Sequence, residues 1–288
     1  IVNMLKSSLK ENAEYIAFVL DAPGPTFRDA LYPQYKANRA AMPDDLRAQV
    51  EPMMAIVQAL GLPVIRVPGV EADDVIGTLA VQAAQDGIDV VISTSDKDFA
   101  QLVNDRIHLT NTMTGSLTDA ARVKDKFGVR PGQIIDYLAL MGDAVDNVKG
   151  VEKCGPKTAA KWLAEYQTLD NLIAHADDIK GVVGQNLRDS LAWLPMAKQL
   201  VTIKCDVDLS AELPNGIPDL QTTTEDSATL LALFKRFGFK TWTREMESRV
   251  ASAPAAPAAV GSIGSSGDLF AEPAVAVGIA TEPLNENA

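Results

Sequence analysis

Short hydrophobic runs alternate with amphipathic stretches through the first half of the chain. Residues 15–20, 88–92 and 107–111 are apolar runs with turn-forming or polar residues beside them, a pattern typical of buried strands. Between the first two runs, the apolar positions of residues 75–83 follow helical spacing, and the pattern stops at Gly87. Strands that alternate with helices predict an α/β fold with a mainly parallel sheet.

Start and stop signals predict further elements of this first region. Residues 44–61 form a helix that opens at Asp44 behind Pro43, closes at Gly61 and is kinked at Pro52, and residues 63–67 form a strand. We expect another helix to begin after Phe99, one capped by Asp119 to run to Gly128, and one to open at Pro131 and run into Gly142.

The second half of the chain has helical periodicity. Pro156 opens one helix, and others are predicted within residues 163–173, 187–201 and 230–237. From Ala251 the composition shifts to Ala, Pro, Gly, Ser and Val, which is typical of a linker. We therefore predict three parts: an α/β domain over residues 1–141, a helical domain over residues 142–245 and a disordered linker over residues 246–288.

Acidic residues recur where these strands end and these helices begin. Because the carboxyl ends of strands in an open α/β sheet lie together, we expect the acids to meet in one place. A helical turn would put Asp143 and Asp146 on one face. Carboxylate oxygens suit a hard divalent cation, and the number of acids suits two Mg²⁺ or Mn²⁺ ions. The candidate metal ligands are Asp21, Glu71, Asp73, Asp74, Asp96, Asp98, Asp143 and Asp146.

Each acidic segment also has a structural interpretation. Asp21 precedes Ala-Pro-Gly-Pro and is a good residue to start a turn. Acids near a helix N-terminus are favoured by the helix dipole, so Glu71, Asp73 and Asp74 are explained equally well by helix capping. The argument for a metal site depends on four separate segments that converge.

Two basic segments are candidates for contact with phosphate. In residues 26–42, Arg28, Lys36 and Arg39 are interleaved with aromatic residues, a mixture that binds a phosphate backbone and stacks on bases, although it also occurs on solvated surfaces. In the second segment, glycines at 150 and 155 bracket a short hairpin before the helix at Pro156. The free amides of that helix N-terminus suit a phosphate.

Composition restricts the remaining possibilities. The net charge of −12 weakens a nucleic-acid partner without excluding it, because bound cations would invert the local field of clustered carboxylates. Two cysteines and two histidines offer no disulfide framework or catalytic triad, and the chain has no P-loop. No apolar run suits a membrane span and no signal-peptide pattern is present, so we expect a cytoplasmic protein without a membrane partner. Phosphodiester hydrolysis fits these residues best.

Several motifs in one order resemble the 5′-nuclease (flap endonuclease) family. Within this family, the motifs most resemble those of the N-terminal 5′→3′ exonuclease domains of bacterial DNA polymerases I. The motifs are Phe27-Arg-Asp, Tyr35-Lys-x-x-Arg39, Glu71-Ala-Asp-Asp-Val-Ile-Gly, Thr94-Ser-Asp-Lys-Asp98, Gly142-Asp-x-x-Asp-Asn and Gly150-x₄-Gly-Pro-Lys-Thr-Ala. The resemblance covers about residues 1–245. It implies a PIN-like domain followed by a helix–two-turn–helix (SAM-like) domain, and a nuclease that removes flaps and primers during DNA replication and repair.

The resemblance also implies residue roles. Asp21, Glu71 and Asp73 resemble the ligands of a first metal and Asp96, Asp98 and Asp143 those of a second, with Asp74 and Asp146 in the same cluster. Lys36 and Arg28 would be the catalytic basic residues, with Lys36 on the scissile phosphate. Residues implied to bind DNA are Tyr35, Arg39, Gly150, Gly155, Lys157 and Thr158.

The implied cofactors are two Mg²⁺ or Mn²⁺ ions, with a K⁺ at the Gly150–Thr158 hairpin. The implied partners are DNA with a 5′ flap, a nick or an RNA primer, and a covalently linked polymerase module, and we expect a monomer.

Two departures from the family pattern are visible. The family carries a first metal-binding Asp on an N-terminal strand that is not found before Ile1, where residues 1–9 already resemble the middle of a helix, so we expect a fragment. Lys149 stands where a Pro is common. Two alternatives stay open: a duplex-DNA-binding fragment that is catalytically incomplete, and a PIN-type ribonuclease.

Overall fold

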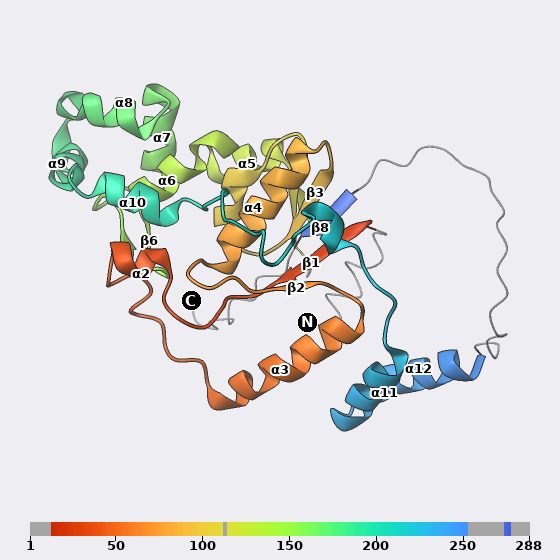
Figure 1. The fold of residues 1–288 in the computed structure, drawn as a ribbon. Helices are drawn as coiled ribbons and strands as arrows, with labels where there is room; N and C mark the ends of the chain where they lie inside the picture. The colour runs from red at the N-terminus through yellow and green to blue at the C-terminus, as the bar shows by residue number, and fades with distance from the viewer. Residues whose placement is uncertain (1–12, 112–113, 253–273, 278–288) are drawn as a thin grey trace.

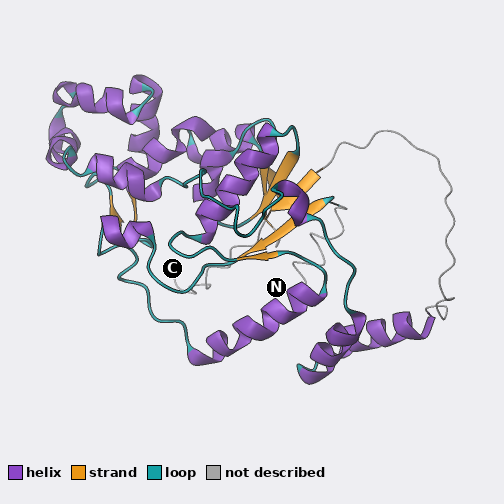
Figure 2. Cartoon of the chain, viewed as in Figure 1, coloured by secondary structure: helices purple, strands orange, loops and turns teal. Residues whose placement is uncertain are grey.

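The computed structural model describes residues 13–111, 114–252 and 274–277, and it contains one main sheet (Figures 1 and 2). The strand order is β2-β1-β8-β3-β4-β5, and every pairing is parallel except that of β4 with β5. The strands are β1 (Tyr15–Val19), β2 (Val64–Ile65), β3 (Asp89–Ser93), β4 (Ile107–Asn111), β5 (Ser116–Thr118) and β8 (Ala274–Val277). The predicted α/β sheet is confirmed.

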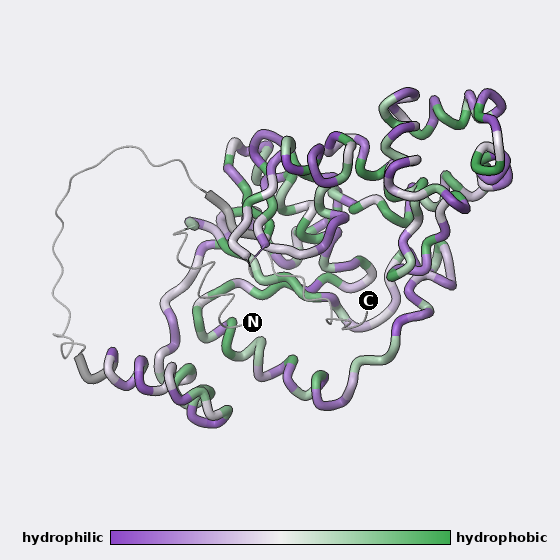
Figure 3. The backbone as a smooth tube through the Cα atoms, turned by 180° about the vertical axis from the view of Figure 1, so that it is seen from behind, coloured by the Kyte–Doolittle hydropathy of each residue, from purple (hydrophilic) through white to green (hydrophobic). Residues whose placement is uncertain are grey.

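Strand β1 is covered on both faces, which explains its continuous apolar run. Ala17 and Val19 belong to the main core, in which helix α4 (Ala72–Gln85) is also buried. The alternate residues Ile16 and Phe18 pack on the opposite face, against helix α3 (Asp44–Ala59). Hydrophobic and hydrophilic colours alternate along α3 in Figure 3, as expected for a helix with one face on the sheet.

Short helices follow the central strands. Residues 98–102 after β3 form the 3₁₀ helix η2 (Asp98–Leu102), where we expected a helix to begin. Helix α5 (Ala120–Phe127) is capped by Asp119, whose carboxylate accepts from the Arg122 amide, and it ends at Gly128, as predicted. Pro131 opens the short η3 (Pro131–Gln133), which continues into α6 (Ile134–Met141).

The region after residue 155 is helical, as predicted. Its helices are α7 (Pro156–Tyr166), α8 (Leu169–Ala174), α9 (Gly181–Ser190) and α10 (Leu194–Val201), with η4 (Ala176–Asp178) between α8 and α9. The predicted stretch 163–173 is divided at Gln167, which has a positive φ of 67°, and Thr168 then caps α8. The stretch 187–201 is likewise divided between α9 and α10.

After α10 the chain returns to the sheet. The segment η5 (Ile217–Leu220) lies against β1, and Gln221 forms a bridge with Tyr15. Helices α11 (Ser227–Arg236) and α12 (Lys240–Ser252) then pack on α3, where Leu230 and Phe234 contact Ile56 and Ala59. In Figure 1 these two helices lie beside α3, at the far side from α7–α9.

Three local expectations differ from the structure. Asp143 and Asp146 do not lie on a helical turn, because Gly142 has a positive φ of 75° that ends α6 and starts the hairpin of β6 (Gly142–Asp143) and β7 (Val148–Lys149). The segment between Gly150 and Gly155 is a turn, and the β-hairpin precedes it. Within the predicted linker, α12 continues to Ser252 and the alternating Ala-Val pairs of β8 join the sheet, while most of residues 253–288 lie outside the described residues.

Candidate metal centre

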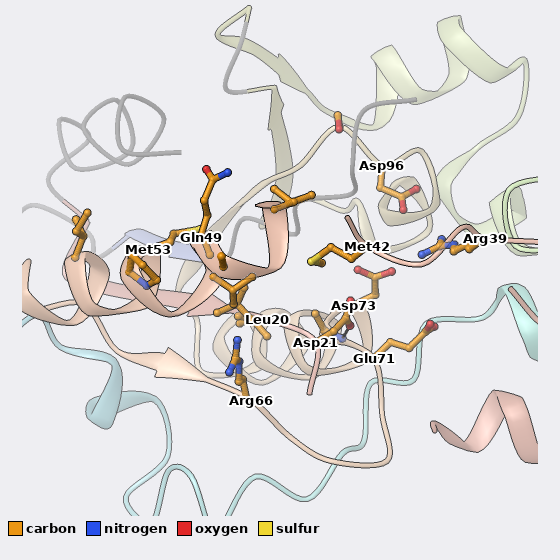
Figure 4. Close-up of a pocket in the computed structure, with 18 of the residues that line it drawn as sticks. Leu20, Asp21, Arg39, Met42, Gln49, Met53, Arg66, Glu71, Asp73 and Asp96 are labelled. Carbon is orange, nitrogen blue, oxygen red and sulfur yellow. Dashed lines mark hydrogen bonds between the residues drawn. The ribbon is translucent and has the colours of Figure 1, made fainter. Parts of the chain in front are cut away.

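Four segments bring acidic side chains to one end of the sheet. Asp21 follows β1, and Asp96 and Asp98 follow β3. Residues 71–74 form the N-cap and first turn of α4, Asp143 ends β6, and Asp146 lies in the turn between β6 and β7. Figure 4 shows Asp21, Glu71 and Asp73 side by side in a cavity, with Asp96 across from them. The cavity has a volume of about 880 Å³ and is lined by acids at one end and by apolar residues of α3 at the other. The expected convergence is therefore present in the fold.

The motif Glu-Ala-Asp-Asp folds as a helix N-terminus. Glu71 is the N-cap of α4 and Asp74 is its third residue. The Glu71 carboxylate accepts from the Asp74 amide, and Asp74 Oδ2 accepts from the Glu71 amide at 3.0 Å, which is a capping box. The amide of Ala72, the first helical residue, donates to Asp21 Oδ1 at 2.8 Å. Helix capping and convergence of the acids are therefore compatible, because the capping hydrogen bonds hold Glu71, Asp74 and Asp21 in place.

Asp74 is completely buried and its oxygens are used by protein donors. Oδ1 accepts from Arg28 Nη2 at 2.8 Å and from the Lys204 amide at 2.9 Å. Oδ2 accepts from Arg28 Nη1 at 2.7 Å and from the Glu71 amide at 3.0 Å. With four donors around it, Asp74 lies behind the acids that face the cavity.

Arg28 is 2% exposed and lies on the same buried side. Apart from Asp74, its guanidinium donates to the carbonyls of Leu200 at 2.9 Å and Thr202 at 2.7 Å, and Nη1 lies 3.0 Å from Glu71 Oε2. Burial alone would lower the pKa of Arg28, but the hydrogen bonds and charge of Asp74 reverse this and raise it. The side chain therefore points away from the surface on which a phosphate backbone would lie.

Lys36 and its neighbours face the open side of the acids. Lys36 Nζ forms an ion pair with Glu71 Oε1, and Tyr35 donates its hydroxyl to Asp146 Oδ2 at 2.8 Å. Arg39 Nη2 pairs with Asp146 Oδ1 at 2.6 Å. Lys36 has a positive φ of 52°, unusual for a side-chain-bearing residue, and its amide donates to the Asp146 carbonyl at 3.0 Å. The family motif Tyr-Lys-x-x-Arg is thus fixed to the turn that carries Asp146.

Asp143 is held in a similar way. Its Oδ1 accepts from the Val145 amide at 2.8 Å, and its Oδ2 pairs with Lys97 Nζ at 2.8 Å. Lys97 stands between Asp96 and Asp98 and was not among the residues predicted for the site. Its place inside an acidic motif was the signal that could have indicated a counter-charge.

Asp73, Asp96 and Asp98 are different, because no ion pair within the described residues joins them to a lysine or arginine at salt-bridge distance. Burial raises the pKa of Asp98 to about 8, and the charges of Asp96 and Asp143 add to the shift. Burial and the charges of Asp96 and Glu71 raise the pKa of Asp73 well above its usual range. Burial also raises the pKa of Asp96. The nearby charges of Lys36 and Lys97 offset these shifts only in part, so the pKa values of the three acids stay raised.

The donor set fits a hard divalent cation. Asp98 Oδ1 is buried and has no hydrogen-bond partner, which is costly unless an external group satisfies it. The surrounding donors are all carboxylate oxygens, as Mg²⁺ and Mn²⁺ prefer. Within the described ranges no three acidic, histidine or cysteine side chains are already arranged around one point. The side chains of Lys36 and Lys97, which now pair with Glu71 and Asp143, would have to move as an ion entered.

The second basic edge lies at the start of α7. Gly155 caps this helix, Lys157 is exposed in its first turn and the Thr158 amide donates to the Gly155 carbonyl. A Cβ built on Gly155 would meet nothing within 4 Å, so the surface there is open to an external group. Gly150 differs, because its Cβ would lie 2.2 Å from the Met141 carbonyl carbon. Its glycine is required by the close approach of the chain to Gly142.

Comparison with known proteins places these features in a family. Residues 1–128 match the family described as "5'-3' exonuclease, N-terminal resolvase-like domain". Residues 129–226 match the family described as "5'-3' exonuclease, C-terminal SAM fold". A 5'-3' exonuclease of Buchnera aphidicola is 38% identical over 218 residues, which are 73% of this chain and 72% of that protein. The chain belongs to the 5'-3' exonuclease family.

Other members of the exonuclease family are much longer than this chain. DNA polymerase I of Pseudomonas aeruginosa is 48% identical over 255 residues, which are 85% of this chain and 28% of that protein. The thermostable DNA polymerase I of Thermus thermophilus is 38% identical over 208 residues, or 25% of its length. The chain thus spans about a quarter of the length of these two relatives.

Solved structures confirm the exonuclease fold. A bacteriophage T5 flap endonuclease, solved with DNA and metal ions, is 22% identical, has a TM-score of 0.62 and covers 81% of this chain and 88% of its own. A T5 5'-exonuclease with bound zinc covers 86% and 89%, with the same TM-score and 21% identity. The predicted order of a nuclease-type α/β domain followed by a SAM-like helical domain is confirmed. Within the described residues, no helix is both long and apolar enough to span a bilayer.

Proposed function

We propose that the chain is the nuclease part of a DNA polymerase I, a divalent-metal-dependent 5′→3′ exonuclease and 5′-flap endonuclease that hydrolyses DNA phosphodiesters in replication and repair. The observation that carries the proposal is the meeting of acids from four segments, with Lys36 between Glu71 and Asp146, in a chain of the 5'-3' exonuclease family. Relatives named DNA polymerase I support the link to a polymerase module.

Two Mg²⁺ or Mn²⁺ ions are the proposed cofactors. Asp21, Glu71 and Asp73 would hold one ion and Asp96, Asp98 and Asp143 the other, with Asp146 beside them; Asp74 acts through the residues it orients. When bound, the ions supply charge neutralisation at the reacting phosphate and lower the pKa of water. The unpartnered Oδ1 of Asp98 and the raised pKa values of Asp73 and Asp96 support this, because each is relieved by a cation.

The chain's own basic residues orient the substrate. Lys36 would leave Glu71 and bind the scissile phosphate, which its half-buried position at the mouth of the acids supports. Arg39, which is exposed beside Asp146, would contact the adjoining nucleotide. The Tyr35 ring is buried in the main core, so Tyr35 would support DNA binding indirectly, through the hydroxyl that donates to Glu71 and Asp146. The raised pKa of Lys36, in which Glu71 and Asp146 outweigh burial, keeps this ammonium charged for the task.

Residues 142–245 are the proposed DNA-binding domain, next to a nuclease domain over residues 1–141. Gly155, Lys157 and Thr158 would bind the duplex backbone at the open N-terminus of α7, with K⁺ as a further ligand, and Gly150 shapes the turn that precedes them. The substrate would be DNA with a 5′ flap, a nick or an RNA primer. We further propose a monomer in the bacterial cytoplasm.

The test is cleavage of a labelled 5′-flap duplex in Mg²⁺ by a protein that contains this chain, compared with its Asp96→Ala/Asp98→Ala variant. We expect the variant to lose more than about a hundredfold in rate while it still binds the flap duplex in Ca²⁺. Undiminished cleavage would reject the proposed centre. Binding of duplex without cleavage by the unaltered protein would instead support the catalytically incomplete DNA-binding fragment, and RNA-only cleavage would support a PIN-type ribonuclease.

A further inference from the structure

The segment after α10 braces the acidic end of the sheet. The Lys204 amide donates to Asp74 Oδ1 at 2.9 Å, and the Ile203 amide donates to Gln101 Oε1 of η2 at 2.9 Å. Gln101 Nε2 returns a hydrogen bond to the Val201 carbonyl at 3.1 Å. Residues 201–204 therefore contact both the N-terminal turn of α4 and the 3₁₀ helix η2. Together with Leu200, whose carbonyl accepts from Arg28, they form the segment that we call the brace.

Gly77 shows how closely this brace approaches α4. A Cβ built on Gly77 would lie 2.5 Å from Ile203 Cγ2, so only a glycine allows the segment to lie directly on the helix. At the next residue of α4, the Thr78 hydroxyl accepts a hydrogen bond from the Val207 amide at 3.2 Å. The brace is thus part of the buried interior.

Arg28 joins this brace to the acids. Its guanidinium makes five interactions: two with Asp74, one each with the carbonyls of Leu200 and Thr202, and an ion pair of Nη1 with Glu71 Oε2 at 3.0 Å. The planar guanidinium donates both to the Asp74 carboxylate and to the carbonyls of Leu200 and Thr202, an arrangement that the single ammonium group of a lysine could not reproduce. The other oxygen of Glu71, Oε1, pairs with Lys36 on the open side.

We propose that Arg28 is a positioning residue that fixes the carboxylate of Glu71 from behind, together with Asp74 and the residue 200–204 brace, and that it has no contact with DNA. The inference rests on the proposed function and deepens it. It replaces the catalytic role that the family motif implied for Arg28, because a side chain 2% exposed with its donors occupied cannot also hold a phosphate. Groups that orient metal ligands typically change metal affinity by 10- to 100-fold when they are lost.

The experiment uses a protein containing this chain and compares Arg28→Lys, Asp74→Asn and the double variant Arg28→Gln/Asp74→Asn. Three quantities are measured: Mn²⁺ affinity by calorimetry without DNA, flap-duplex affinity in Ca²⁺ against salt concentration, and the urea midpoint of unfolding. We expect Arg28→Lys to weaken Mn²⁺ binding about tenfold, with an unchanged salt slope of DNA binding.

The double variant separates positioning from a purely structural role. Removing both charges spares the fold a lone buried charge, so we expect the urea midpoint to recover most of what Asp74→Asn loses. Mn²⁺ affinity is expected to stay about tenfold low, because the contact with Glu71 is still absent. Full recovery of Mn²⁺ affinity in the double variant would overturn the inference, and so would unaltered Mn²⁺ affinity in Arg28→Lys.

A contact with DNA would produce a different result. In that case Arg28→Lys or the double variant would change flap-duplex affinity, and loss of the charge would reduce the salt slope by about one unit. Arg39→Gln is the matched control, because this exposed arginine is proposed to contact DNA and its loss is expected to lower the slope. If the unaltered protein neither binds nor cleaves the flap duplex, the proposed function fails, whereas the Mn²⁺ titrations still decide the role of Arg28.

Discussion

Seven of the eight acids of this site fall into two groups with opposite electrostatic surroundings, and the eighth, Asp21, accepts a hydrogen bond from the Ala72 amide. Glu71, Asp74, Asp143 and Asp146 each pair with an arginine or lysine, and we call them the paired acids. Asp73, Asp96 and Asp98 have no such partner among the described residues and have raised pKa values, and we call them the uncompensated acids. The paired acids are held in place by the protein itself. The negative charges of the uncompensated acids are unfavourable in the folded protein, and a bound cation would offset them.

The difference separates two tasks within one carboxylate cluster. A paired acid has a fixed orientation before any ligand arrives, and this lowers the cost of assembling the site. An uncompensated acid contributes little to folding but gains the most from an incoming cation. Stability measurements on matched Asp→Asn variants therefore distinguish the two groups without reference to catalysis.

The largest expected effect is at the centre of the paired group. We expect Asp74→Asn to lower the free energy of unfolding by about 3 kcal/mol, because Arg28 would be left as a buried charge without its partner. Urea unfolding followed by circular dichroism measures this. Asp206→Asn is the control, since Asp206 is exposed and its pairing with Lys204 at 3.7 Å is worth well under about 1 kcal/mol. A loss below that of the control would mean that pairing does not hold these acids.

The corresponding change in the uncompensated group is expected to have the opposite sign. In a chelator at pH 8, Asp98→Asn removes a charge that is disfavoured by burial and by Asp96, so we expect the free energy of unfolding to rise by about 1 kcal/mol. The same variant is expected to lose most of the stabilisation that Mn²⁺ gives to the unaltered protein. Asp105→Asn, at an exposed position, is the control. A fall in stability would remove the distinction between the groups.

The pH dependence of stability follows from the same carboxyl. The pKa of Asp98 is raised in the folded chain to about 8, so the folded state holds a proton that the unfolded state releases near pH 4. Its stabilising contribution is therefore present below about pH 4 and is lost as the pH rises toward about 8. In a chelator we expect the urea midpoint to fall between pH 5 and pH 8.5, less so for Asp98→Asn, and Mn²⁺ to flatten the decline. A midpoint that rises over this range would contradict the assignment.

The smallest effect is expected where a cation near the cluster is exposed. Lys97 pairs with Asp143, but its side chain is 39% exposed, so solvent screens the pair. We expect Lys97→Gln to change the free energy of unfolding by less than about 1 kcal/mol, again by urea unfolding in a chelator. If Lys97→Gln lowered the free energy of unfolding as much as Asp74→Asn, Lys97 would stabilise the fold as Arg28 does, and exposure would not distinguish the two cations.

Much of the fold could be predicted because local signals and tertiary packing agree. The cap at Asp119, the start of α7 at Pro156 and the buried strands at 15–20 and 88–92 depend on short stretches of sequence. Asp143 and Asp146 were misjudged as a helical pair because spacing alone does not reveal the positive φ of Gly142 that ends α6. A helix was expected over 163–173, but Gln167 interrupts it with a backbone conformation that its side chain does not favour.

The candidate site was predictable in its residue types and less so in its roles. Acids at strand ends indicated the convergence, since that follows from sheet topology. The burial of Arg28 and Asp74 depends on residues 200–204, more than 120 positions after Asp74, and no local pattern announces a contact at that separation. Helices α11 and α12 are another example, because their packing on α3 requires Leu230 and Phe234 to meet Ile56 across the chain.

The packing of α11 and α12 on α3 has a consequence for how far this chain can be shortened. The SAM-fold match ends at residue 226, one residue before α11 begins. A chain cut at that boundary would keep both family regions but would uncover the face of α3 on which Leu230, Phe234 and Met246 lie. Helix α3 also lines the cavity beside the acids, through Met53 and Ile56. A shortened chain that keeps α3 covered should therefore retain α11 and α12, past the end of the family match.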